Sequence, residues 1–347
     1  MAQAQQVIQN NEFSGADIVL PMTEEVRART QPVYQKLKSQ ISEMEWTYFA
    51  PLIDEINRLK KEKNAVILAH NYQTPEIFHG VADIVGDSLK LAKDALEVEA
   101  DVIVLCGVHF MAETAKILNP AKTVLIPDPT AGCSLAESIT AEGLRSLKAQ
   151  YPGVPVVTYV NTTAEVKAET DICCTSGNAV EVIESLGVDR VIMAPDKYLA
   201  QNIAKQTGVE VITWDGRCEV HELFTPEQIQ DFRDQNEGVV VIAHPECTPE
   251  VVEASDFAGS TAQMVDFVAT KKPEKVFMVT ECSMSDNVSA EHPDVEFVKP
   301  CTVCPHMKKI NLSKIIHCLR DLSNEVTVAP EVAEKARASI TRMLAVK

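Results

Sequence analysis

Four of the ten cysteines in this 347-residue chain stand in loop-like sequence, where their thiols could bind a metal. Cys133, Cys218, Cys301 and Cys304 each follow an apolar run and lie among glycine, proline and polar residues. Loops at strand ends are where α/β proteins place their ligands. Several other cysteines, such as Cys106 within VIVLCGV, are typical of small buried hydrophobic residues.

The loop cysteines are regularly spaced. From position 133 to position 218 is 85 residues, and from position 218 to position 304 is 86. This period suits a small α/β domain used three times, although coincidence among ten cysteines is the alternative. Three converging thiolates could hold an iron–sulfur cluster and leave one of its four irons open as a Lewis acid. Cys301-x-x-Cys304 alone would also fit half of a zinc site or a redox dithiol.

Other polar groups stand where apolar runs end. They are His70, Asn71 and Tyr72 after the first run, Tyr159 and Asn161 after the second, and His244 and Glu246 after the third. A single histidine at a strand end is most often a satisfied structural residue. Three such ends aimed at one axis would instead indicate a shared site.

Hydroxyl residues precede three of the expected helices, in Asp87-Ser88, Thr175-Ser176-Gly177 and Gly259-Ser260-Thr261. Serine or threonine at such a position is usually an N-cap. The same geometry can also bind a carboxylate or phosphate through helix N-terminal amides. The chain contains no G-x-G-x-x-G and no GxxxxGK[ST], so neither a usual dinucleotide site nor a P-loop is predicted.

Short apolar runs alternate with helix-like stretches from residue 64 onward, as expected of buried parallel strands with crossover helices. We predict strands at 65–71, 101–110, 123–128, 156–162, 171–177, 190–196, 210–216, 239–246, 275–281 and 295–300, with 256–261 a short strand or loop. We predict helices at 44–63, 87–97, 112–118, 163–169, 178–186, 198–206, 249–255 and 262–271. The pattern restarts twice, which again indicates three units.

The net charge is −18, from 32 basic and 50 acidic residues. Such an excess opposes binding to nucleic acid or to an anionic membrane, both of which need basic patches. We see no apolar run of about 18 residues and no secretory signal at the start of the chain. We therefore expect a cytoplasmic protein with reduced thiols and neither membrane nor nucleic-acid partners.

The motifs resemble one family, quinolinate synthase of de novo NAD biosynthesis. The resemblance covers nearly all of residues 65–318 and rests on AHNYQTPEI…GDSLKLAK, GVHFMAETAKILNP, GCSLAESI, YVNTTAEVKAETD, TSGNAVEVI, APDKYLAQNIAKQTG, WDGRCEVHELF, HPEC, GSTAQM and CPHMKKINL. It implies a transferase that condenses iminoaspartate with dihydroxyacetone phosphate to quinolinate, phosphate and water. It also implies three similar Rossmann-like αβα sandwich domains with short parallel sheets in pseudo-threefold arrangement, and an active site at their junction.

The resemblance also implies roles for individual residues. One [4Fe–4S] cluster per chain would be held by Cys133, Cys218 and Cys304, with the fourth iron facing substrate, while Cys301 would be a redox neighbour or a bystander. Glu246 would be the general acid or base, assisted by Tyr159 and His70. The substrate-pocket positions would be His70, Tyr72, Ser88, Tyr159, Asn161, Ser176, His221, His244, Glu246, Ser260 and Thr261.

Repeat and resemblance together predict a division into an extension at 1–50, units at 51–135, 136–222 and 223–318, and a helical segment at 319–347. L-aspartate oxidase would be a transient supplier of iminoaspartate. Two alternatives stay open: a [4Fe–4S]-dependent hydro-lyase of a hydroxy-acid, and a zinc- or cluster-binding regulator without catalytic activity.

Overall fold

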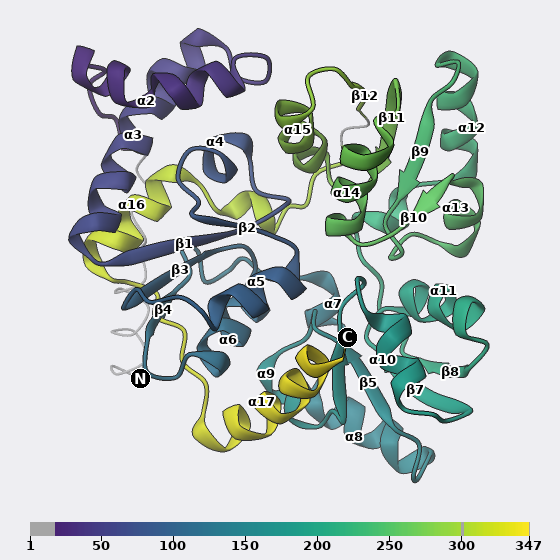
Figure 1. Cartoon of the computed structure of the whole chain (residues 1–347). Helices are drawn as coiled ribbons and strands as arrows, with labels where there is room; N and C mark the ends of the chain where they lie inside the picture. Colours follow the sequence, from purple (N-terminus) through teal and green to yellow (C-terminus); the bar gives the residue numbers. More distant parts are fainter. Residues whose placement is uncertain (1–17, 300–301, 347) are drawn as a thin grey trace, which may run out of the picture.

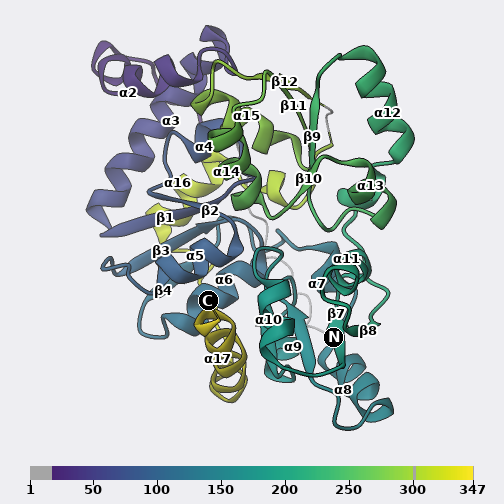
Figure 2. The ribbon, with the colours of Figure 1, turned by 45° about the vertical axis from the view of Figure 1, so that its right-hand side comes forward.

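The computed structural model describes residues 18–299 and 302–346, and the strands there form three separate four-stranded sheets. Neighbouring strands in each sheet run parallel. In Figure 1 the sheets and their helices form three lobes, in blue at the left, teal at the lower right and green at the upper right. The same lobes are seen in Figure 2 after a turn of 45°. The predicted α/β class with three similar units is confirmed.

The first sheet has the strand order β2-β1-β3-β4. Its strands are β1 (Ala65–His70), β2 (Ile84–Gly86), β3 (Val102–Cys106) and β4 (Thr123–Leu125). The helices between them are α4 (Pro75–Phe78), α5 (Ser88–Ala95) and α6 (His109–Leu118).

The second sheet has the order β6-β5-β7-β8. Its strands are β5 (Val156–Tyr159), β6 (Ile172–Cys174), β7 (Arg190–Ala194) and β8 (Glu210–Thr213). Its helices are α7 (Ser134–Glu137), α8 (Ala141–Gln150), α9 (Ala164–Ala168), α10 (Ala179–Ser185) and α11 (Lys197–Thr207).

The third sheet has the order β10-β9-β11-β12. Its strands are β9 (Val240–Ala243), β10 (Phe257–Ala258), β11 (Lys275–Val279) and β12 (Glu296–Val298). Around it lie η1 (His221–Leu223), α12 (Pro226–Gln235), α13 (Pro249–Ala254), α14 (Thr261–Lys271), α15 (Cys282–Glu291) and η2 (Met307–Lys309). All three sheets therefore have the same strand order: the second strand in the sequence lies at one edge, and the first, third and fourth follow it across the sheet.

Four further helices join the units at the two ends of the described chain. They are α2 (Glu24–Leu37), α3 (Glu43–Glu62), α16 (Leu312–Asp321) and α17 (Pro330–Ala345). Helix α3 packs under β1 and against α16, while α17 crosses to the second unit and packs on α9 and β6, as Figure 1 shows. The segment that follows the third sheet thus returns to the first two.

Helix α3 shows why these elements form. Ser42 and Glu45 make a capping box at its start, and Trp46, Ile53 and Ile56 are buried on one face. Each such aliphatic side chain contributes about 1.5–3 kcal/mol through its removal from water. The 3.6-residue period of the sequence is therefore matched by the buried stripe of the helix.

The predicted strands and helices are largely found, with differences at their ends. The expected strand 101–110 ends at Cys106, because Val108 is the N-cap of α6 and the helix begins at His109. Strand β2 and helices α2, α4, α7, α8, α12, α15 and α16 were not predicted, whereas α17 lies in the helical segment predicted at 319–347. Each predicted unit contains one sheet, but α3, α7, η1 and α16 each cross a predicted boundary, and the boundaries themselves remain a prediction.

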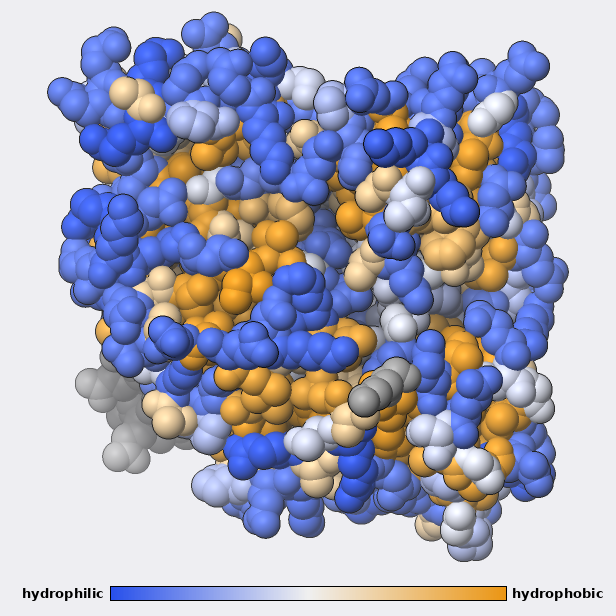
Figure 3. Space-filling model, in the orientation of Figure 1, coloured by the Kyte–Doolittle hydropathy of each residue, from blue (hydrophilic) through white to orange (hydrophobic). Residues whose placement is uncertain are grey.

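Hydrophilic residues dominate the outer edge of the face seen in Figure 3, and apolar residues show mainly inside that edge. Among the described residues we find no helix with the length and apolar character needed to cross a membrane.

Candidate active site

Loops from all three units line one cavity. His70 and Tyr72 come from the end of β1, and Tyr159 comes from the end of β5. His244 and Glu246 follow β9. Because the carboxyl ends of parallel strands share one edge of their sheet, three such edges facing inward form a common site.

Each unit supplies the same set of positions to this cavity. A hydroxyl follows the second strand of each sheet, at Ser88, Ser176 and Thr261. A cysteine follows the fourth strand, and the complete set is Cys133, Cys218 and Cys304. The period seen in the sequence is therefore the period of a triplicated site.

All but one of the residues predicted for the site line the cavity: His70, Tyr72, Ser88, Cys133, Tyr159, Asn161, Ser176, Cys218, His221, His244, Glu246, Thr261 and Cys304. The exception is Ser260, which is 1% exposed and caps α14. Its Oγ accepts a hydrogen bond from the backbone N–H of Gln263, and its own N–H donates to Gln263 Oε1 at 2.8 Å. Thr261 faces the cavity in its place. Cys301 lies outside the described residues.

The three thiols fit a metal cluster better than a single ion. Burial raises the pKa of the Cys133 thiol to about 12, and it also raises the pKa of Cys218 and of Cys304. Metal binding displaces these protons and so offsets the cost of burying thiolates. The three sulfurs line the same cavity but do not all lie within 4.8 Å of one another, a wider spacing than the ligand atoms of a single ion have.

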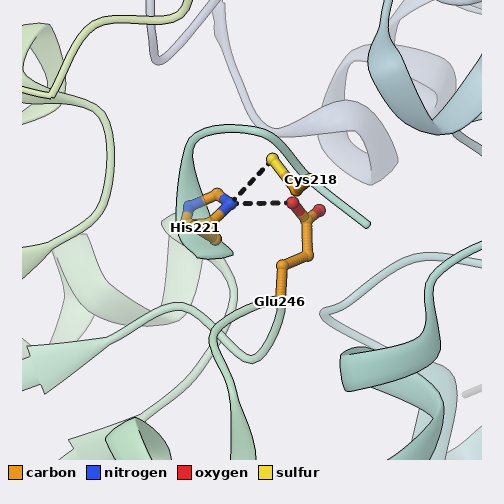
Figure 4. A group of neighbouring side chains, drawn as sticks. All are labelled: Cys218, His221 and Glu246. Atoms are coloured by element: carbon orange, nitrogen blue, oxygen red, sulfur yellow. Dashed lines mark hydrogen bonds and ion pairs between the residues drawn. The ribbon is translucent and has the colours of Figure 1, made fainter. Parts of the chain in front are cut away.

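Glu246 is the centre of the buried hydrogen-bond network shown in part in Figure 4. Its Oε1 accepts a hydrogen bond from Tyr159 Oη at 2.5 Å, and its Oε2 lies 2.8 Å from His221 Nδ1. The same nitrogen lies 3.1 Å from Cys218 Sγ. The imidazole thus stands between a thiol of the second unit and a carboxylate of the third.

The comparisons with known proteins agree with this geometry. A family model described as "Quinolinate synthetase A protein" matches residues 54–345. The chain belongs to this family. It is 63% identical to "Quinolinate synthase 2" of Mesorhizobium japonicum over 314 residues, which cover 90% of this chain and 97% of that one. It is also 63% identical to "Quinolinate synthase" of Agrobacterium fabrum, with 90% of each chain covered, and of Xylella fastidiosa, with 85% and 87% covered.

Two histidines of this quinolinate synthase family site are uncharged at neutral pH. Burial lowers the pKa of His70 to about 4 and that of His244 to about 3. His70 Nδ1 accepts from the N–H of Tyr72 at 3.1 Å, and His244 Nδ1 accepts from the N–H of Glu246 at 3.3 Å. Each ring therefore carries its proton on Nε2; that of His244 lies 3.2 Å from Ser176 Oγ, which accepts it, and that of His70 can donate to a ligand.

The carboxyl of Glu246 is charged. Burial alone would raise its pKa, but the neighbouring His244 and His221 and the hydrogen bonds from His221 and Tyr159 outweigh burial and lower it. Burial also raises the pKa of Tyr159 and Tyr72, and the charge of Glu246 raises both further. Both phenols therefore keep their protons, and Tyr159 is the donor to Glu246.

Sequence reasoning missed Thr280 at the end of β11. Its Oγ1 lies 2.6 Å from Tyr72 Oη and 3.0 Å from His221 Nε2, so it joins the first unit to the second. A threonine at the end of an apolar run carries no signal of its own. The structure also adds Asp87, Met111, Glu219, His306 and Met307 to the lining. Glu219 is next to Cys218, and His306 is two residues from Cys304. This closeness to predicted ligands is the sequence signal that could have found both residues.

Proposed function

We propose that this chain is a quinolinate synthase, a transferase of de novo NAD biosynthesis. It would condense iminoaspartate with dihydroxyacetone phosphate to quinolinate with release of phosphate and water. The observation that carries the proposal is the convergence of three distant cysteines and the strand-end polar groups in one cavity. The alternative hydro-lyase is not favoured, because the relatives described above are named quinolinate synthase.

Cys133, Cys218 and Cys304 would hold one [4Fe–4S] cluster. When bound, this group would supply an open iron that acts as a Lewis acid in the loss of water. The site is built to receive anions without a cluster of lysines. The hydroxyls that follow the second strands and the Nε2–H group of His70 would be neutral donors to carboxylate and phosphate oxygens, and His244 would orient the Ser176 hydroxyl from 3.2 Å.

Asn161 adds a group that suits a polar ligand. Its side chain lines the cavity, and its buried Oδ1 has no hydrogen-bond partner among the described residues. An unpaired buried amide oxygen costs about 1–3 kcal/mol, which a ligand N–H or O–H would recover. Amide oxygen and nitrogen are assigned from such networks, so either end of this amide can face the ligand.

Glu246 would be the general base. Its carboxylate lines the cavity and is held in position by Tyr159 and His221, so it can accept a proton from the carbon next to a carbonyl or imine. Tyr159 would keep its own proton and orient the carboxylate through its 2.5 Å hydrogen bond, and His70 would donate from Nε2. Closure in a cavity between three units would exclude water from these transfers.

The proposal is tested by phosphate release and quinolinate formation from iminoaspartate and dihydroxyacetone phosphate under anaerobic conditions. Omission of either substrate is the matched control, because a hydro-lyase would not need both. Stoichiometric quinolinate and phosphate are expected. Lack of both products from protein with a full complement of iron and sulfide would refute the proposed activity. Supply by L-aspartate oxidase and a cytoplasmic location belong to the same proposal.

A further inference from the structure

Cys218, His221 and Glu246 present three metal-ligand atoms within 4.8 Å of one another. Cys218 and His221 come from the loop after β8, and Glu246 comes from the loop after β9. Figure 4 shows the thiol and the carboxylate on either side of the imidazole. These atoms meet in one place because two units face each other across the cavity.

The donor set and its dimensions suit zinc. Sulfur, imidazole nitrogen and carboxylate oxygen are the three ligand types that Zn²⁺ accepts, at about 2.0–2.3 Å. Tetrahedral bonds of that length place ligand atoms about 3.5 Å apart. The separations in the structure are 3.1 Å from His221 Nδ1 to Cys218 Sγ and 2.8 Å to Glu246 Oε2, so a small outward movement makes room for the ion.

The outer contacts of the group are those of a prepared metal site. The second nitrogen of His221 lies 3.0 Å from Thr280 Oγ1, which leaves Nδ1 for a metal. The other oxygen of Glu246 is held by Tyr159. His221 and Glu246 are 1% and 3% exposed. Ligands already oriented and dry lose little entropy when an ion binds.

An iron–sulfur cluster and a single ion would each use Cys218 as a ligand, but together with different residues. The three cysteine sulfurs are too far apart for one ion, whereas the mixed group holds its atoms close. We propose that the cluster-free protein binds one Zn²⁺ through Cys218 Sγ, His221 Nδ1 and the Glu246 carboxylate, and that this ion excludes the cluster because both need Cys218. The zinc site itself does not depend on the proposed activity, and only the competition rests on the proposed cluster.

The direct test uses cluster-free full-length protein prepared anaerobically and stripped with a chelator. Titration with Zn²⁺ against a chromophoric chelator should show one tight site. His221→Ala and Glu246→Gln should each weaken it by about tenfold or more, and Cys218→Ser should remove it. Cys133→Ser and Cys304→Ser are the matched controls, because both lose a predicted cluster ligand and both should bind zinc with wild-type affinity.

Co²⁺ gives a second readout in the unmodified protein. A sulfur-to-cobalt charge-transfer band with tetrahedral visible bands is expected, at an intensity for one thiolate rather than three. Wild-type zinc affinity in His221→Ala, loss of zinc in Cys133→Ser, or a spectrum of three thiolates would overturn the assignment.

The competition is measured by cluster reconstitution from ferrous iron and sulfide, followed by visible absorption. One equivalent of Zn²⁺ should block assembly in the wild type, and a chelator should restore it. His221→Ala should lose this inhibition. Equal assembly with and without zinc in the wild type would refute the exclusion of the cluster. If the cluster-free protein binds zinc in this way, but zinc-free protein with a full complement of iron and sulfide makes no quinolinate, the proposed activity alone is refuted.

Discussion

The substitution Glu246→Gln tests whether Glu246 acts in catalysis or only maintains the structure of the site. The carboxylate is buried and makes hydrogen bonds to Tyr159 at 2.5 Å and His221 at 2.8 Å. Glutamine keeps the shape and one acceptor oxygen but cannot take up a proton. A positioned general base is worth about 10²–10⁴ in rate, or about 2.7–5.4 kcal/mol of barrier. We expect kcat to fall by that factor and KM to change little.

The effect on stability should be much smaller. A hydrogen bond to a charged partner is worth about 1.5–3 kcal/mol and one between neutral groups about 0.5–1.5, so two bonds lose about 2–3 kcal/mol. Removal of the buried charge offsets part of this loss, because an ionised carboxylate pays for desolvation. The variant should therefore fold and keep its iron.

The assay is anaerobic turnover with parallel iron and sulfide analysis. Glu76→Gln is the matched control, since this carboxylate in α4 is half-buried, accepts a hydrogen bond from Thr74 and does not line the cavity. It should keep wild-type kcat. Wild-type kcat in Glu246→Gln would remove Glu246 from the mechanism. Loss of iron in that variant would show that the Glu246 carboxylate keeps the Cys218 loop in place and is not needed for proton transfer.

Three more predictions address the ligands, the histidines and the missed threonine. Alanine at Cys304, or at either other lining cysteine, should abolish iron binding and activity, whereas Cys301→Ala should keep both; normal iron in Cys304→Ala would refute the ligand assignment. From pH 7 to pH 5 the unfolded chain protonates His70 and His244 while the folded protein does not, so stability should fall by about 2 kcal/mol for each. Urea unfolding of the cluster-free protein at several pH values checks this, and an unchanged slope in His70→Gln would contradict it. Thr280→Val should lower kcat by about tenfold, because Tyr72 and His221 lose their bridge; wild-type kinetics would make Thr280 a bystander.

Strand positions could be predicted from the sequence because the central strands are short continuous apolar runs. Ile67 and Leu68 in β1 and Val241 and Ile242 in β9 are fully buried. Strand β2 could not be predicted, because it has three residues and lies at a sheet edge. Helix α15 escaped notice for another reason: its sequence CSMSDNVSAE buries serines and an asparagine beside methionine and valine.

The lining of the cavity could be predicted in outline because the polar residues at the ends of the apolar runs and the motifs shared with the family point to the same part of the fold. It was harder to decide which of the adjacent residues Ser260 and Thr261 lines the cavity. The pattern Ser260-x-x-Gln263 is a capping box, and this could have assigned Ser260 to the helix cap and Thr261 to the cavity. Thr280 could not be found this way, because its role arises only when β11 is placed beside loops from two other units.

The three units share a local plan but use it differently, which explains how a repeated scaffold yields an asymmetric site. Each first strand leads into two polar side chains at positions i and i+2, and in the first and third units these lie in a turn closed by hydrogen bonds from Gln73 N–H to His70 O and from Cys247 N–H to His244 O. In the first and third units the leading residue is a histidine whose Nδ1 accepts the N–H two residues on. In the second unit Tyr159 stands there, has no ring nitrogen, and instead donates across the cavity to Glu246 of the third. Repetition thus brings the loops to one place, and the difference at this single position makes the hydrogen-bonded pair of Tyr159 and Glu246.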